Sequence, residues 1–124
     1  MKTTATALQM VIRLTGVILI LLGGLFWSGS ALQWINAHMI IGIILVLALW
    51  ILALLAVRAK VSLLTVGLAI IWGLLVVIVG MTQMRLMPGA SHWVIQVVHL
   101  ILGLGAMGLG ESLGLRIKRS AATA

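Results

Sequence analysis

Cysteine and tyrosine are absent from this chain of 124 residues, and there is one proline, one phenylalanine and a single acidic residue, Glu111. Without cysteine the chain cannot form a disulfide, hold an iron–sulfur cluster or a thiolate metal site, or attach a c-type haem covalently. No set of acid–base or nucleophilic side chains is recognisable, so an active site that transforms a substrate is not expected.

Apolar residues dominate what is present, at 64% of the chain. A water-soluble domain of this size cannot bury so much apolar surface, and an integral membrane protein is the class that fits. Four continuous runs, about 7–27, 34–57, 61–83 and 91–115, each have the roughly 20 residues that a membrane-spanning helix needs. None alternates with the period of two that a membrane β-barrel shows. The sequence therefore predicts an all-α fold, a single four-helix transmembrane domain that occupies residues 1–124.

Short polar segments separate the runs, at 28–33, 58–60 and 84–91, and the last contains Pro88. Connections this short make sequential helices antiparallel neighbours. We expect an up-down-up-down bundle, in which the second and fourth spans run in the same direction.

The net charge of +7 indicates membrane orientation rather than nucleic-acid binding. In the four-span arrangement, every basic residue except Arg85 lies on the same side of the membrane as the termini. By the positive-inside rule, both termini are therefore cytoplasmic. Trp27, Trp34 and Trp93 fall at the predicted outer ends, as in an interfacial aromatic belt. We interpret 7–27 as a first transmembrane helix rather than a signal peptide, and the compact chain predicts a prokaryotic plasma membrane. The seven basic residues on the cytoplasmic side are Lys2, Arg13, Arg58, Lys60, Arg116, Lys118 and Arg119.

Two histidines stand in the same pattern within apolar runs. His38 and His99 each follow a serine by eight residues, Ser30 and Ser91, and each precedes a glycine by four. Imidazole inside a membrane span is costly unless it is bound, so such residues are functional candidates. Each histidine lies roughly 12 Å along its helix from its serine, and the two helices run in the same direction. The two rings are therefore predicted to lie at one level and to share a ligand, with haem iron as the first candidate.

A haem b at this level needs two axial nitrogens, a slot for the macrocycle and partners for its propionates. We expect His38 and His99 to be the axial pair and Arg85 to pair with a propionate. Gly80 and the Gly23–Gly24 pair, level with the histidines, are the glycines expected to line the haem edge. The outer polar residues expected to hydrogen-bond the second imidazole nitrogens or the propionates are Asn36, Gln83, Gln96, Ser30, Ser91 and His92.

Two further groups have alternative interpretations. Met81, Met84 and Met87, at positions i, i+3 and i+6 on a helix end, can form a soft Cu(I) site near His92 or serve as adaptable apolar filler. Arg13 and Glu111 lie inside the first and fourth spans, and since a charge in lipid needs a partner, we predict that they pair.

The His-x-x-x-Gly motifs, His38 to Gly42 and His99 to Gly103, resemble those of the small four-helix b-type cytochromes of the cytochrome b561-like group. The Gln83 to His99 spacing is also similar to that of related short four-span families. The resemblance implies a bis-histidine haem b and membrane electron transfer, often with quinone, and makes Gly42 and Gly103 part of the cofactor site. Many of those cytochromes carry two haems on four histidines, whereas this chain has no histidine in the inner half of any span. The sequence therefore predicts one haem, near the outer face of the membrane.

The sequence thus predicts a membrane electron carrier with one haem b, either a small subunit of a respiratory or photosynthetic complex or a quinone-linked shuttle. A second copy of the chain is a further candidate partner. The alternatives are a non-redox accessory or assembly subunit, a small copper-handling protein, and a chlorophyll-type pigment held by a single histidine.

Overall fold

The computed structural model describes residues 1–123 and is helical almost throughout. The elements are α1 (Lys2–Trp27), a 3₁₀ turn η1 (Leu32–Trp34), α2 (Ile35–Arg58), α3 (Leu63–Thr82), a second 3₁₀ turn η2 (Gly89–Ser91) and α4 (His92–Thr123). No strand occurs within residues 1–123. All four helices are long and apolar enough to cross a membrane, which confirms the all-α fold and the four predicted spans.

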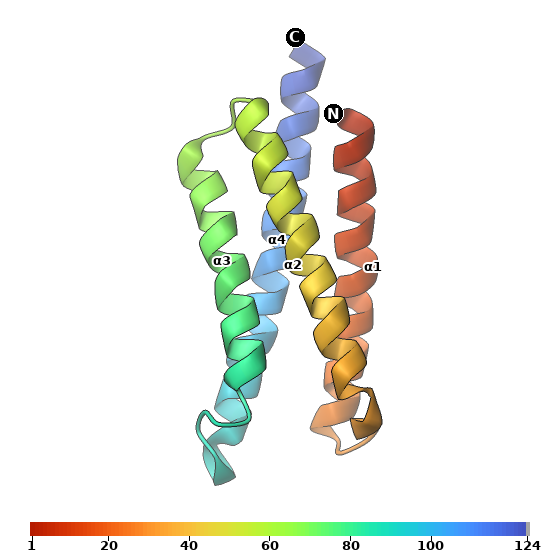
Figure 1. Cartoon of the computed structure of the whole chain (residues 1–124), viewed down its shortest axis with the longest axis vertical. Helices are drawn as coiled ribbons and strands as arrows, with labels where there is room; N and C mark the ends of the chain where they lie inside the picture. Colours follow the sequence, from red (N-terminus) through yellow and green to blue (C-terminus); the bar gives the residue numbers. More distant parts are fainter. Residues whose placement is uncertain (124) are drawn as a thin grey trace.

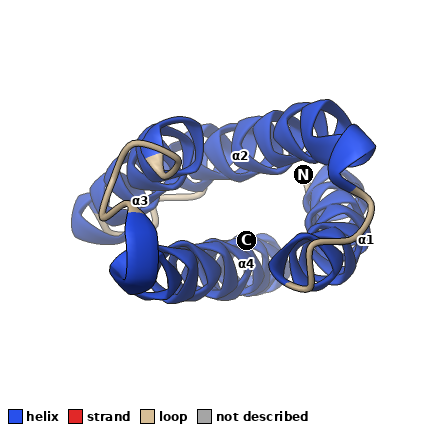
Figure 2. Ribbon diagram, turned by 90° about the horizontal axis from the view of Figure 1, so that it is seen from below, coloured by secondary structure: helices blue, strands red, loops and turns tan. Residues whose placement is uncertain are grey.

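Consecutive helices are antiparallel neighbours, and both termini lie at the same end of the bundle (Figure 1). Viewed from the opposite end, the helices surround an oval with α2 facing α4 and α1 facing α3 (Figure 2). Helices α2 and α4 contact each other across the short axis of this oval, whereas within residues 1–123 α1 and α3 do not pack together. Residues on α2 and α4 can therefore meet at the centre.

Two helices are longer than predicted, because packing contacts hold their terminal turns in place. Helix α4 continues to Thr123 rather than ending near residue 115, because its last turns are held by contacts. Ile117 is fully buried, and the Ser120 hydroxyl donates to the Ala59 carbonyl at 2.9 Å. Helix α1 likewise begins at Lys2 rather than at residue 7, with Ala5 fully buried.

The buried core lies mostly in the half of the bundle that carries the termini. Its largest fully buried side chains are Ile12, Leu49, Leu52, Leu113, Ile117, Gln9 and Val46. Glycines permit the close approach of helices here: a methyl group at Gly110 would overlap Ile12, and one at Gly114 would overlap Gln9. This matches the small-residue packing expected where membrane helices associate without a hydrophobic driving force.

Two tryptophans tie neighbouring helices together near the middle of the bundle. Trp50 of α2 donates its indole N–H to the carbonyl of Ile70 at 3.2 Å, and Trp72 of α3 donates to that of Leu102 at 2.8 Å. Each indole also lies against the glycine three residues after its acceptor, Gly73 and Gly105 respectively, where a methyl group would collide with the ring. The same tryptophan–glycine contact therefore joins α2 to α3 and α3 to α4.

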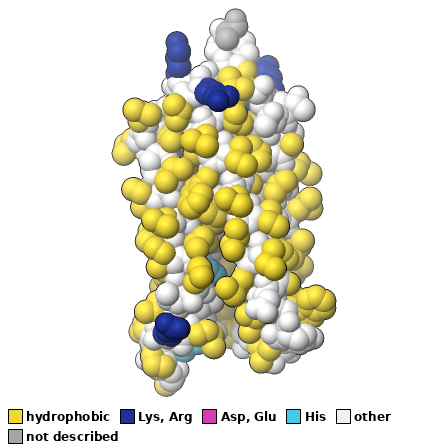
Figure 3. All heavy atoms as spheres, viewed as in Figure 1, with side chains coloured by type: hydrophobic (Ala, Val, Ile, Leu, Met, Phe, Trp, Pro, Cys, Tyr) yellow, Lys and Arg dark blue, Asp and Glu magenta, His cyan; other side chains and the backbone are white. Residues whose placement is uncertain are grey.

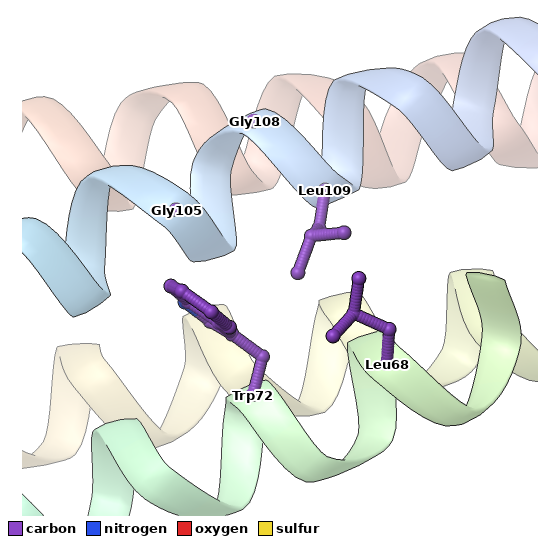
Figure 4. A pocket seen from close by; sticks show the side chains of 5 residues that line it. All are labelled: Leu68, Trp72, Gly105, Gly108 and Leu109. Atoms are coloured by element: carbon purple, nitrogen blue, oxygen red, sulfur yellow. The ribbon is translucent and has the colours of Figure 1, made fainter. Parts of the chain in front are cut away.

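Beside Trp72 an apolar cavity of about 320 Å³ lies between α3 and α4 (Figure 4). No histidine or charged residue lines it, so it is separate from the histidine pair. Its lining residues are Leu68, Trp72, Gly105, Gly108 and Leu109.

The other half of the bundle is less closed. We define the histidine half as residues 18–27 of α1, 35–44 of α2, 77–82 of α3 and 92–103 of α4. Ile95, at 8% exposure, is the only buried residue within these ranges. Helices α2 and α3 diverge toward this end in Figure 1, and Figure 3 shows a hollow there with histidine atoms (cyan) visible below the surface.

Candidate cofactor site

The structure brings the two histidines of the repeated pattern together. His38, near the start of α2, and His99, in the second turn of α4, point at each other with ring centroids 6.3 Å apart and ring planes 49° apart. The prediction that the two rings lie at one level is confirmed. The spacing from the serines holds in sequence only, because Ser30 precedes η1 and lies outside any helix while Ser91 closes η2.

Each histidine carries an unsatisfied nitrogen. The Nδ1 atoms of His38 and His99 are both buried and have no hydrogen-bond partner within residues 1–123. Asn36, Gln83 and Gln96, the expected partners, form no hydrogen bond with either ring within residues 1–123, and their role toward a bound haem stays a prediction. Asn36 is exposed to the outside of the bundle, and Gln83 follows the last residue of α3.

A glycine of the preceding helix packs against each imidazole. A methyl group at Gly80 of α3 would lie 3.0 Å from His99 Cε1, and one at Gly23 of α1 would lie 3.8 Å from His38 Cε1. Both glycines were expected to line the site, and the structure places both beside a histidine. The two hairpins, α1–α2 and α3–α4, therefore present their histidines in the same way.

The only phenylalanine completes the wall around one ring. Phe26, in the last turn of α1, lies with its ring centroid 5.3 Å from that of His38 and its plane tilted by 60°. Sequence reasoning missed this residue, because its partner lies on the next helix. The uniqueness of Phe26 in the composition was the one signal that could have drawn attention to it.

Open space adjoins the histidines on their own helices. Gly42 and Gly103 lie one turn beyond His38 and His99, on the same helix faces. A methyl group at Gly103 would meet no atom within 4 Å, and one at Gly42 would only just reach Leu19 at 4.0 Å. In contrast with the tightly packed glycines of the termini half, these positions do not bring helices together.

These observations fit a flat macrocycle better than a bare metal ion. Metal–nitrogen bonds of about 2 Å place two imidazoles on opposite sides of one metal with ring centres roughly 6 Å apart. The observed separation is 6.3 Å. Within residues 1–123 no three His, Cys, Asp or Glu side chains form a metal-binding group. A haem brings its own four equatorial nitrogens and asks the protein for only two ligands, which is what His38 and His99 can supply.

The remaining polar residues of this end lie in the α3–α4 connection. Arg85 is exposed, and its side chain forms no hydrogen bond or ion pair within residues 1–123. His92, the first residue of α4, has its Nδ1 atom 3.3 Å from the carbonyl oxygen of Leu86. Both residues lie at the histidine end of the bundle, as expected, but the structure does not join them to His38 or His99.

The three methionines do not share a helix face. Helix α3 ends at Thr82, so Met81 is helical while Met84 and Met87 lie in the connection that follows. All three are exposed, Met84 most of all at 75%. The regular i, i+3, i+6 arrangement expected for a copper site is therefore absent.

The predicted Arg13–Glu111 pair is confirmed. The guanidinium binds the carboxylate with both arms, Nε to Oε1 at 2.6 Å and Nη2 to Oε2 at 2.8 Å. Buried Gln9 extends the network, since it donates to Glu111 Oε2 at 3.0 Å and accepts from Lys118 at 2.7 Å. These polar groups of α1 and α4 satisfy one another in the termini half, away from the histidine pair.

Comparison of the chain with protein-family models, with curated proteins and with solved structures finds no match. The function is therefore inferred from the geometry of the site.

Proposed function

We propose that this chain is a membrane electron-transfer protein that binds one b-type haem between His38 and His99. The observation that carries the proposal is the facing pair of imidazoles, 6.3 Å apart, in the half of the bundle that has almost no closed core. A haem with two axial histidines supplies reversible one-electron chemistry when it is bound.

The chain's own residues have separate tasks in this proposal. His38 and His99 are the ligands, Gly80 positions the His99 ring by its close approach, and Gly23 lies beside the His38 ring. Phe26 covers His38, and the surrounding apolar side chains keep water from the site. Each histidine would bind the metal through one ring nitrogen, and its other nitrogen, protonated, would need an acceptor; neither Nδ1 atom has one within residues 1–123.

Arg85 is the residue we assign to a propionate, with His92 as a second donor at the same end. Arg85 suits this role because no carboxylate of the chain lies near it: the single acidic residue, Glu111, is engaged by Arg13. Gly42 and Gly103 leave space for the edge of the macrocycle beside each ligand.

The positive-inside bias supports cytoplasmic termini in a prokaryotic plasma membrane and places the histidine half toward the outer face. One haem at that depth does not carry electrons across the whole bilayer. Electrons are therefore exchanged near the outer face, with a quinone or with a redox subunit of a larger membrane complex.

A reduced-minus-oxidised absorption spectrum of the purified protein tests the proposal. We expect sharp α and Soret bands that disappear in the His38→Ala/His99→Ala variant and persist in a His92→Ala control. This variant keeps both axial ligands and removes only the proposed second propionate donor on the same helix as His99, so the bands should persist.

A colourless protein, purified with its lipids and partners intact, would contradict the proposal and leave the non-redox accessory subunit as the leading alternative. A bacteriochlorophyll spectrum that survives loss of one of the two histidines would replace haem by a singly ligated pigment.

A further inference from the structure

A second site lies at the opposite end of the bundle, where the α2–α3 turn meets the end of α4. A cavity of about 320 Å³ opens there, within the range of small-ligand sites of about 300–1,000 Å³. Its lining residues are Met1, Arg58, Ala59, Lys60, Ser120, Ala121 and Thr123.

The turn that carries the two cations is fixed. Arg58 ends α2, and Lys60 follows in the left-handed region with φ of 56°. Three backbone hydrogen bonds close the turn, from the amides of residues 59, 60 and 61 back to carbonyls of the last turn of α2. Ser120 fastens α4 to this turn through the Ala59 carbonyl at 2.9 Å. The cavity is therefore held by three elements rather than by one mobile loop.

The two cations of this cavity have no acceptor, unlike three other basic residues at the same end of the bundle. Arg13 is bound to Glu111, Lys118 to Gln9, and Arg116 to the Ser112 hydroxyl at 3.3 Å. The side chains of Arg58 and Lys60 form no hydrogen bond or ion pair within residues 1–123. Since Glu111 is the single acidic side chain and is already paired, no carboxylate side chain within residues 1–123 remains to neutralise them.

The residues beside the cavity, on the side that faces the membrane interior, are strongly apolar. Leu63 and Leu64, at the start of α3, are 74% and 83% exposed, and Leu54 on α2 is 64% exposed. A ligand that places an anion between Arg58 and Lys60 can thus lay a hydrocarbon chain along α2 and α3. Basic residues that border a span attract anionic lipid headgroups.

We propose that this cavity binds the phosphate headgroup of an anionic phospholipid, with Arg58 and Lys60 as the cationic contacts and the Ser120 and Thr123 segment of α4 as its wall. This site is independent of the proposed haem, since it lies at the other end of the bundle and uses no residue of the histidine half.

Binding of short-chain phosphatidylglycerol and phosphatidylcholine to the full chain in a non-ionic detergent, followed by native mass spectrometry, tests the site. We expect phosphatidylglycerol to bind the wild type selectively and the Arg58→Gln/Lys60→Gln variant roughly tenfold more weakly, as two membrane-surface cations predict. An Arg116→Gln/Arg119→Gln variant removes the same charge from the same end of the bundle without touching the cavity lining, and should bind within about twofold of the wild type. An Arg58→Lys/Lys60→Arg variant should retain binding, and circular dichroism confirms that each variant is folded.

Equal weakening in the two glutamine variants would overturn the proposal, because it would show diffuse attraction rather than a site. Equal binding of the two lipids would do the same. Displacement of the lipid by low-millimolar inorganic phosphate would identify a free-anion site and overturn the lipid assignment.

Discussion

At the scale of single residues, the histidine pair is the least satisfied part of the molecule. A buried polar group without a partner costs about 1–3 kcal/mol, and both Nδ1 atoms are in this position. By contrast, every charged or amide group of the Arg13–Glu111–Gln9–Lys118 network has a partner. The polar groups of the network in the termini half therefore have partners, whereas the two imidazoles of the histidine half do not. A site that binds a ligand requires such unpaired groups.

The contact between Gly80 and His99 gives a prediction for the ring position. A methyl group at Gly80 would lie 3.0 Å from His99 Cε1, so Gly80→Ala must displace the ring by a few tenths of an ångström. We expect haem affinity to fall about tenfold, the lower range for loss of a group that orients a metal ligand. Haem titration and the low-spin electron paramagnetic resonance spectrum measure the change.

Gly67→Ala is the matched control for Gly80→Ala, because Gly67 lies on the same helix outside the histidine half and no atom lies within 4 Å of the methyl group it introduces. Identical affinity and spectra for the two variants would show that Gly80 does not position the ligand.

The Arg13–Glu111 pair gives a second prediction. Glu111→Gln leaves the Arg13 guanidinium without its carboxylate inside a membrane-spanning segment, where an unpaired charge is costly. We expect the melting temperature in detergent to fall by several degrees. The double variant Arg13→Gln/Glu111→Gln should recover part of the loss, since it removes the stranded charge. A double variant less stable than Glu111→Gln would contradict a pairing role.

At the scale of helices, tryptophan and glycine determine how neighbours pack in the middle of the bundle. An indole in a span needs both space and an acceptor for its N–H, and a glycine with the carbonyl three residues before it supplies both. The sequence shows Trp50, Trp72, Gly73 and Gly105, but their pairing depends on the rotation of one helix relative to the next. For that reason small-residue packing could be predicted in general and these contacts could not.

Replacing Gly105 tests this contact. A methyl group there would collide with the Trp72 ring, so Gly105→Ala should destabilise the protein by about 1–3 kcal/mol, the usual cost of overpacking. Gly108→Ala on the same helix meets no atom within 4 Å and brings the same gain in helix propensity. Equilibrium unfolding in mixed micelles compares the two, and equal stabilities would refute the Trp72–Gly105 contact.

At the scale of the whole molecule, the chain divides into two halves with different packing. The termini half is closed by fully buried side chains and a satisfied polar network, and it carries every basic residue except Arg85. The histidine half has Ile95 as its one buried residue and contains the facing pair of imidazoles. The closely packed end therefore holds the four helices together and leaves an open site at the other end.

The orientation of these halves in the membrane gives the fourth prediction. The chain has no cysteine, so Ser30→Cys and Ser62→Cys each introduce a unique thiol at an exposed serine at opposite ends of the bundle. We expect a membrane-impermeant maleimide to label Ser30→Cys in intact cells, and Ser62→Cys only after the membrane is opened, because the positive-inside rule predicts that the basic end faces the cytoplasm. The reverse pattern would place the histidine half at the inner face.

The sequence by itself determined the class and the candidates. Hydrocarbon surroundings permit only helices for four apolar runs of this length, and short connections make those helices antiparallel neighbours, so no tertiary information was needed. The cost of imidazole and of charge in lipid likewise singled out His38, His99, Arg13 and Glu111.

The tertiary structure decided what the spacing along the chain cannot express, the rotation and tilt of each helix. Rotation aimed the two histidines at each other, paired each with a glycine of the preceding helix, and turned Asn36 away from them. Packing carried α4 eight residues past its predicted end, because Ile117 is buried and Ser120 bonds to the α2–α3 turn. A helix period places side chains on a face, but only contacts between helices decide what that face meets.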